Sequence, residues 1–113
     1  MDMDSYYFIL EGHTPKAVSL REWGKWMEVN RMNKNVADDT INGTRVSTVF
    51  LGSDHGFGSG SPVLFETMMF DAEGDTAHDE YQERYCTWEE AEEGHRRAVI
   101  KLEHASNERM KNA

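Results

Sequence analysis

Residues 45–70 read RVSTVFLGSDHGFGSGSPVLFETMMF and place two apolar stretches on either side of a loop that contains four glycines. The first stretch, residues 45–51, has the β-branched and aromatic composition of a strand. The second stretch, residues 63–70, is polar only at Glu66 and Thr67, which is typical of a strand covered on both faces. We therefore predict a central antiparallel hairpin with a long connecting loop.

Further strands are predicted on both sides of this hairpin. Asn42-Gly43 is a strong turn signal, because both central positions of a type I′ turn require a positive φ. Residues 5–10, Ser-Tyr-Tyr-Phe-Ile-Leu, have strand composition, and the strand is expected to end before Gly12 and Pro15. Residues 80–86 are expected to form a last strand at an edge of the sheet.

Two capping boxes predict where helices begin. Ser19 is followed three positions later by Glu22, and Thr87 by Glu90, so that each hydroxyl can cap the amide of the acid. The first helix is expected to reach about residue 33, with an apolar stripe that includes Leu20. The second is expected to run from residue 88 to about residue 104, and acids in its first turn also suit the helix dipole.

The order of these elements predicts an α+β fold. We expect two layers, an antiparallel sheet of three to five strands with two helices packed on one face. The 113 residues fit one domain, residues 1–113, and contain no internal repeat or linker.

Cysteine content and hydropathy indicate a cytoplasmic protein. Cys86 is the only cysteine, so no disulfide can form within the chain, and no secretory leader is recognised. The acidic surroundings are expected to raise the pKa of the Cys86 thiol. No apolar run approaches the roughly 20 residues that span a bilayer. Gly56, Gly58 and Gly60 lack the Lys-Ser/Thr of a phosphate-binding loop, and no cofactor is indicated.

The charge of the chain is strongly negative and unevenly distributed. The formal net charge is −9, and in residues 71–93, which we call the acidic segment, ten acids are opposed by Arg84 alone. Such a segment disfavours direct binding to nucleic acid or membrane and favours a basic protein partner, although it can also serve only for solubility. The predicted binding residues are Asp71, Glu73, Asp75, Asp79, Glu80 and Glu83.

Two histidines and a glutamate are candidates for chemistry. His95 lies on the apolar stripe of the second helix, directly after Gly94, whose cost of about 1 kcal/mol in a helix suggests close approach to the sheet. His55 follows Asp54 in the glycine-rich loop, and Glu66 lies within an apolar strand. If they converge, His55, Glu66 and His95 could hold a metal ion or act as a general acid and base. A structural hydrogen-bond network around a buried histidine is the other reading of the same residues.

Three segments resemble a group of small phage and prophage proteins. They are residues 45–55, RVSTVFLGSDH; residues 64–68, LFETM; and residues 85–95, YCTWEEAEEGH. The resemblance implies an accessory protein made in the cytoplasm of an infected bacterium. It implies no catalytic residues.

Charge and resemblance together predict a phage accessory protein that acts by binding rather than as an enzyme. Its partner would be a host defence or nucleic-acid-handling complex with a basic surface, inhibited in the manner of an anti-CRISPR protein or a DNA mimic. Two alternatives stay open. One is a small metal-dependent or acid/base enzyme that uses His55, Glu66 and His95, and the other is a structural phage protein that forms a homodimer through an exposed sheet edge.

Overall fold

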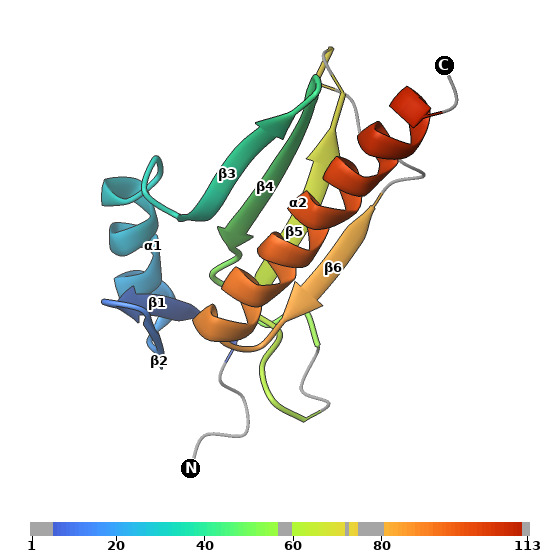
Figure 1. Cartoon of the computed structure of the whole chain (residues 1–113). Coiled ribbons are helices and arrows are strands. Elements are labelled where there is room, and N and C mark those ends of the chain that lie inside the picture. Colours follow the sequence, from blue (N-terminus) through green and yellow to red (C-terminus); the bar gives the residue numbers. More distant parts are fainter. Residues whose placement is uncertain (1–5, 57–59, 72, 75–80, 112–113) are drawn as a thin grey trace.

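A four-stranded antiparallel sheet carries the long helix α2 on one face and a smaller unit, made of α1 and a hairpin, at one end in the computed structural model (Figure 1). The structure describes residues 6–56, 60–71, 73–74 and 81–111, the last six by their backbone alone. The elements in chain order are β1 Phe8–Glu11, β2 Thr14–Ala17, α1 Leu20–Val29, β3 Asn35–Ile41, β4 Thr44–Phe50, β5 Phe65–Phe70, β6 Gln82–Tyr85 and α2 Trp88–Lys111.

The large sheet has the strand order β3-β4-β5-β6, and each strand is antiparallel to its neighbours. The predicted central hairpin is confirmed, because β4 pairs with β5 from Arg45 opposite Phe70 to Phe50 opposite Phe65. The predicted Asn42-Gly43 turn joins β3 to β4, with φ of 50° and 86°. The last strand, β6, lies at an edge as expected.

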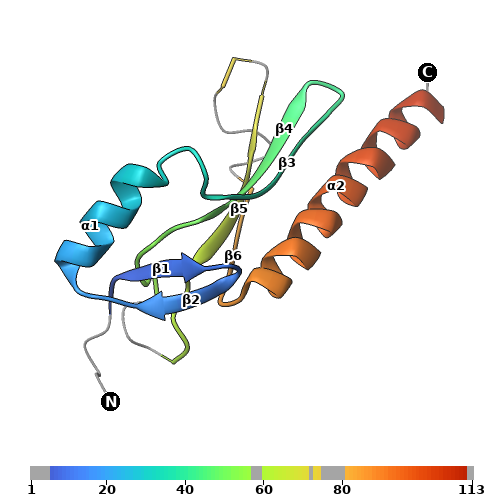
Figure 2. The same ribbon diagram turned by 90° about the vertical axis from the view of Figure 1, so that its left-hand side faces the viewer.

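The side chains that face α2 make the core of the protein. Alternate residues of a strand point to opposite faces, so one set from β4 and β5 meets α2 and the other set points away. Figure 2 shows α2 along one side of the sheet. Two apolar clusters form there; the first is Phe8, Phe50, Leu64, Phe65, Tyr85 and Ala91, and the second is Val46, Met69, Ala98 and Leu102.

The start of α2 and its close approach to the sheet follow the sequence predictions. The Glu90 amide donates to Thr87 Oγ1 at 3.1 Å, and the Thr87 amide donates to Glu90 Oε1 at 3.1 Å, which completes the capping box. Gly94 packs against the tyrosine of β6, since a Cβ at this position would lie 2.0 Å from Tyr85 Oη. The helix continues beyond residue 104, to Lys111.

Helix α1 is attached more loosely than α2. The Glu22 amide donates to Ser19 Oγ at 3.2 Å, as predicted, but the helix ends at Val29 rather than near residue 33. None of its residues is buried, and Leu20, expected on the apolar stripe, is exposed. Trp26 meets the Phe50 ring edge-on at 5.7 Å, Trp23 meets the Tyr7 ring at 5.1 Å and Met27 packs beside Gly52, so the stripe is used except for Leu20.

The strand β2 was not predicted. It pairs antiparallel with β1 as a separate two-stranded sheet, with Pro15 opposite Leu10. Proline is tolerated in a strand that has a neighbour on one side only, because its missing N–H can face away from that neighbour. The α+β class with two helices and antiparallel strands is confirmed, and the strands divide into a sheet of two and a sheet of four.

Candidate functional site

His95 occupies the buried face of α2 and joins the helix to two strands. Its Nδ1 lies 2.7 Å from Thr48 Oγ1 of β4, and its Nε2 lies 2.8 Å from Asp39 Oδ2 of β3. The imidazole is almost fully buried, whereas the Asp39 side chain is 55% exposed. His95 therefore connects the core of the protein to its surface.

The hydrogen bonds continue from Thr48 across the sheet. Thr48 Oγ1 lies 2.6 Å from Thr67 Oγ1 of β5, and the Tyr85 hydroxyl of β6 donates to Thr67 Oγ1 at 3.0 Å. Both threonines are fully buried. We call this row, formed by Asp39, His95, Thr48, Thr67 and Tyr85, the hydroxyl chain.

The hydroxyl chain has one consistent direction when the imidazole is neutral. The Asp39 carboxylate can only accept, so Nε2 of His95 carries the proton and Nδ1 accepts from the Thr48 hydroxyl. Because Thr48 has a single proton, its bond to Thr67 must be donated by Thr67, which in turn accepts from Tyr85. Both threonine hydroxyls are thus satisfied as donor and acceptor, and the strands and α2 are fixed to one another.

Desolvation acts on the tyrosine at the far end. Burial raises the pKa of Tyr85, and the nearby Glu83 carboxylate raises it further. The net direction is upward, so the phenol keeps the proton that it donates to Thr67.

A groove of about 280 Å³ opens where the hydroxyl chain reaches the surface. It lies between β3 and α2, and we call it the acidic groove. The exposed carboxylates of Asp39 and Glu92 lie on it, while Arg96 is ion-paired with Glu93. Its lining residues are Ala37, Asp39, Glu92, His95, Arg96 and Val99.

The order Asp39, His95, Thr48 matches the acid, base and hydroxyl of a nucleophilic triad. A nucleophile must reach its substrate, but the Thr48 side chain is fully buried, and its oxygen is hydrogen-bonded on both sides. This geometry corresponds to the structural network that the sequence left open as an alternative. The hydrogen bonds of the chain hold the core together, and the Thr48 oxygen is not exposed to a substrate.

Glu66 does not join His95. Its neighbour Thr67 faces α2, so Glu66 points to the opposite face of the sheet. There Arg84 Nε donates to Glu66 Oε2 at 2.9 Å, and Gln82 Nε2 donates to the same oxygen at 2.8 Å. Glu66 and His95 therefore do not converge, as the metal-ion or acid/base alternative required, and Glu66 is a buried acid satisfied by its neighbours on β6.

The Asp54-His55 pair builds the loop between β4 and β5. The Asp54 carboxylate is buried and accepts from the amides of Gly56 at 2.7 Å and Val63 at 2.9 Å. The His55 amide donates to the Val63 carbonyl at 2.9 Å, which closes the loop. No three His, Cys, Asp or Glu side chains group as metal ligands in the part of the chain that the structure describes, so His55, Glu66 and His95 are not brought together there.

Cys86 is a poor nucleophile in this setting. Burial raises the pKa of its thiol, and the carboxylates of Glu90 and Asp54 raise it further. The upward direction agrees with the sequence prediction, with burial as the largest cause.

Half of the predicted acidic binding residues can be placed. Asp75, Asp79 and Glu80 lie outside the described residues, whereas Asp71, Glu73 and Glu83 are described. Asp71 accepts from the Glu73 amide at 3.0 Å in an exposed turn.

Arginines from outside the acidic segment neutralise part of it. Arg97 Nη2 donates to Glu83 Oε1 at 2.6 Å, and Arg96 pairs with Glu93. Arg84, the one basic residue within the segment, pairs with Glu66 instead. Counting charge along the sequence therefore overstated the charge that the segment presents.

Comparisons with known proteins found no match for this chain. No protein-family model matches the chain, and neither a curated protein nor a solved structure matches it. Over the described residues, neither helix has the length and apolarity to cross a membrane.

The sequence reading missed four members of the hydroxyl chain, namely Asp39, Thr48, Thr67 and Tyr85. One signal was available for the threonines. Thr48 and Thr67 each lie within a strongly apolar strand, and a polar residue in such a strand needs a partner.

Proposed function

We propose that this chain acts by binding, and that its acidic surface engages a basic surface of a bacterial host complex that handles nucleic acid or defends against phage. The observation that carries the proposal is the pair of exposed carboxylates, Asp39 and Glu92, on the acidic groove. Asp39 accepts from His95, but among the described residues neither carboxylate forms an ion pair with an arginine or lysine. Both can therefore pair with a cation on another molecule. The phage resemblance supplies the kind of partner.

The surface around the groove suits such a partner. With a net charge of −9, the chain attracts basic proteins over several ångströms and speeds their association. Because the hydroxyl chain ties β3, β4, β5, β6 and α2 together, the two carboxylates are presented by a rigid frame. A rigid binding surface loses little conformational entropy when the partner docks.

Catalysis is the weaker reading of the same residues. The one hydroxyl next to His95 is buried beneath α2, and the three candidate metal ligands, His55, Glu66 and His95, are not grouped together. An acidic surface on a rigid core can act by binding alone, without catalysing a reaction. It can compete with nucleic acid for a basic channel by charge alone.

The test is recovery of a partner from a bacterial host lysate with the tagged protein, followed by binding measurements with the isolated partner at low and moderate salt. Affinity should fall steeply as salt rises from about 0.05 to about 0.3 M, since exposed charges are screened. Asp39→Asn with Glu92→Gln should weaken binding by at least about tenfold. The amide oxygen that replaces the Asp39 carboxylate can still accept from His95, so this variant should keep its fold.

The matched control is Glu28→Gln with Glu103→Gln, which removes two exposed carboxylates that do not line the groove. The control should bind like the unmodified chain. A second variant, with Glu73, Asp75, Asp79 and Glu80 neutralised together, tests whether the acidic loop shares the contact. Binding that ignores salt and every charge change would contradict the proposal, as would light scattering that finds only self-association of the 13.0 kDa chain.

A further inference from the structure

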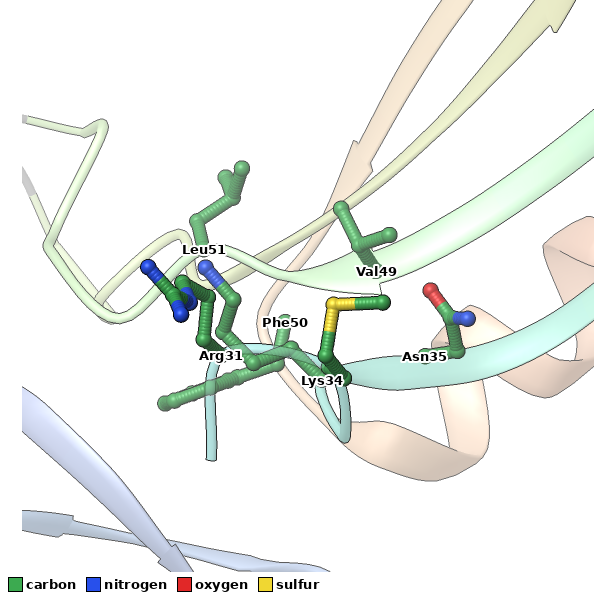
Figure 3. A pocket seen from close by; sticks show the side chains of 7 residues that line it. Arg31, Lys34, Asn35, Val49, Phe50 and Leu51 are labelled. Atoms are coloured by element: carbon green, nitrogen blue, oxygen red, sulfur yellow. The ribbon is translucent and has the colours of Figure 1, made fainter. Parts of the chain in front are cut away.

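A second pocket lies apart from the acidic groove, and its charged lining residues are positive rather than negative. Its volume is about 350 Å³, and it is formed by the connection between α1 and β3 and by the end of β4 (Figure 3). Val49 of β4 lies opposite Glu66 of β5, on the face that α2 does not cover. We call this second pocket the cationic pocket, and it shares no lining residue with the acidic groove.

Two cations line this pocket. The side chains of Arg31 and Lys34 run the same way in Figure 3, so that both charged ends lie beside Leu51 in this view. The chain has 21 acidic and 12 basic residues, yet no ion pair among the described residues involves Arg31 or Lys34. Two like charges that share a pocket repel each other, and an anion placed between them removes that repulsion.

Apolar side chains form the rest of the wall. Val49 and Leu51 are half-buried, and Met32 is 83% exposed. Methionine is flexible and polarisable and can fold over ligands of different shape. Phe50 also lines the pocket, although its side chain is almost fully buried in the core that faces α2.

We propose that the cationic pocket binds a small organic dianion with an apolar body, such as the phosphate monoester of an aromatic or aliphatic alcohol. Two cations balance a dianionic head and can donate charge-assisted hydrogen bonds to its oxygens. Val49, Leu51 and Met32 then cover the apolar body. The volume lies in the range of small-molecule sites.

The experiment is an NMR titration of the full chain with three probes at a pH where phosphate monoesters are dianions. Phenyl phosphate has head and body, inorganic phosphate has the head alone, and benzyl alcohol has the body alone. Phenyl phosphate should shift the amides of residues 31–35 and 49–51 and should bind at least about tenfold more tightly than either part. Added salt should weaken it.

Four single variants locate the site. Arg31→Gln and Lys34→Gln should each weaken phenyl phosphate binding by about fivefold, the effect of losing an exposed charge pair. Lys25→Gln removes an exposed cation on α1 outside the pocket and should leave the affinity unchanged. Met32→Ser should weaken phenyl phosphate but not inorganic phosphate.

Several outcomes overturn the proposal. They are the absence of shifts at millimolar phenyl phosphate, shifts that map to other residues, or equal losses in the Lys25 and Lys34 variants. Equal affinity for phenyl phosphate and inorganic phosphate would remove the apolar part of the assignment. A partner that binds the acidic groove leaves all these outcomes unaffected, so this site and the proposed function stand or fall separately.

Discussion

Helices α1 and α2 begin in the same way and reach different environments. In both helices the cap hydroxyl accepts from the amide three positions later, Ser19 from Glu22 and Thr87 from Glu90, and each helix has an internal glycine. In α2 that glycine touches the sheet, and one face of the helix is buried, whereas α1 has no buried residue. Local signals thus decide where a helix starts, and tertiary packing decides how much stability it contributes.

The largest expected effect separates the two glycines. In Gly94→Ala the new Cβ would meet Tyr85 within 2.0 Å, and the buried ring cannot move aside without losing its bond to Thr67. We expect a loss of about 3 kcal/mol in the free energy of unfolding, measured by chemical denaturation. Gly24→Ala is the matched control, since its Cβ meets nothing within 4 Å, and it should stabilise α1 by up to about 1 kcal/mol. Equal effects at the two sites would show that the helices do not differ in this respect.

The next effect tests the hydroxyl chain under α2. Thr48→Val keeps the shape of the side chain but leaves His95 Nδ1 and the Thr67 hydroxyl without their partner. The free energy of unfolding should fall by about 2 kcal/mol, the cost of buried polar groups that lose a hydrogen bond. Thr40→Val, at an exposed position of β3, is the control. A Thr48→Val variant with an unchanged free energy of unfolding would mean that the hydroxyl chain contributes no stability.

The two caps should differ in where their loss is felt. Thr87→Ala should lower the global free energy of unfolding by about 1 kcal/mol, because α2 unfolds with the core. Ser19→Ala should instead speed amide hydrogen exchange within α1 while the denaturation curve barely moves, because α1 can open locally. A global loss of equal size in both variants would contradict this distinction.

The smallest expected effect is on stability at alkaline pH, and it involves Tyr81 on the α2 side of the sheet. Burial, followed by the hydrogen bond to Glu83, raises the pKa of Tyr81 from 10.0 to about 12. A raised folded-state pKa means that the folded protein holds the proton more tightly, so this stability is complete below pH 10 and is lost as pH rises from 10 to 12. Tyr81→Phe should flatten the decline in denaturation midpoint across this range. Tyr6→Phe, at an exposed tyrosine near α1, should leave the decline unchanged.

The features that could be predicted from sequence are those decided by neighbouring residues. Both caps, the Asn42-Gly43 turn and the Gly94 contact follow from local backbone chemistry. The hydroxyl chain joins His95 to residues 56 and 47 positions away, and no local pattern encodes such a pairing. Whether Glu66 or Thr67 faces the helix depends on which side of the sheet α2 covers, and the strand sequence is the same in either case.

Charge was predicted in amount but not in arrangement. The sequence identified the acidic segment, yet the arginines that neutralise Glu83 and Glu93 come from the following turns of α2. The acidic groove depends on Asp39, which is far from that segment in sequence. The exposed negative charge is therefore found where β3 and α2 bring Asp39 and Glu92 together, and not along one stretch of the sequence.

The single direction of the hydroxyl chain has a consequence for its protons. Neither threonine hydroxyl can turn alone, because its proton would then point at a neighbour that is itself a donor, and the neighbour that it left would lose its hydrogen bond. If both imidazole nitrogens carry a proton, the Thr48 proton must turn toward Thr67, and the Thr67 proton must then turn away from Thr48. The buried groups therefore have two collective arrangements in place of many independent ones, and their rotational entropy is frozen or released as a unit.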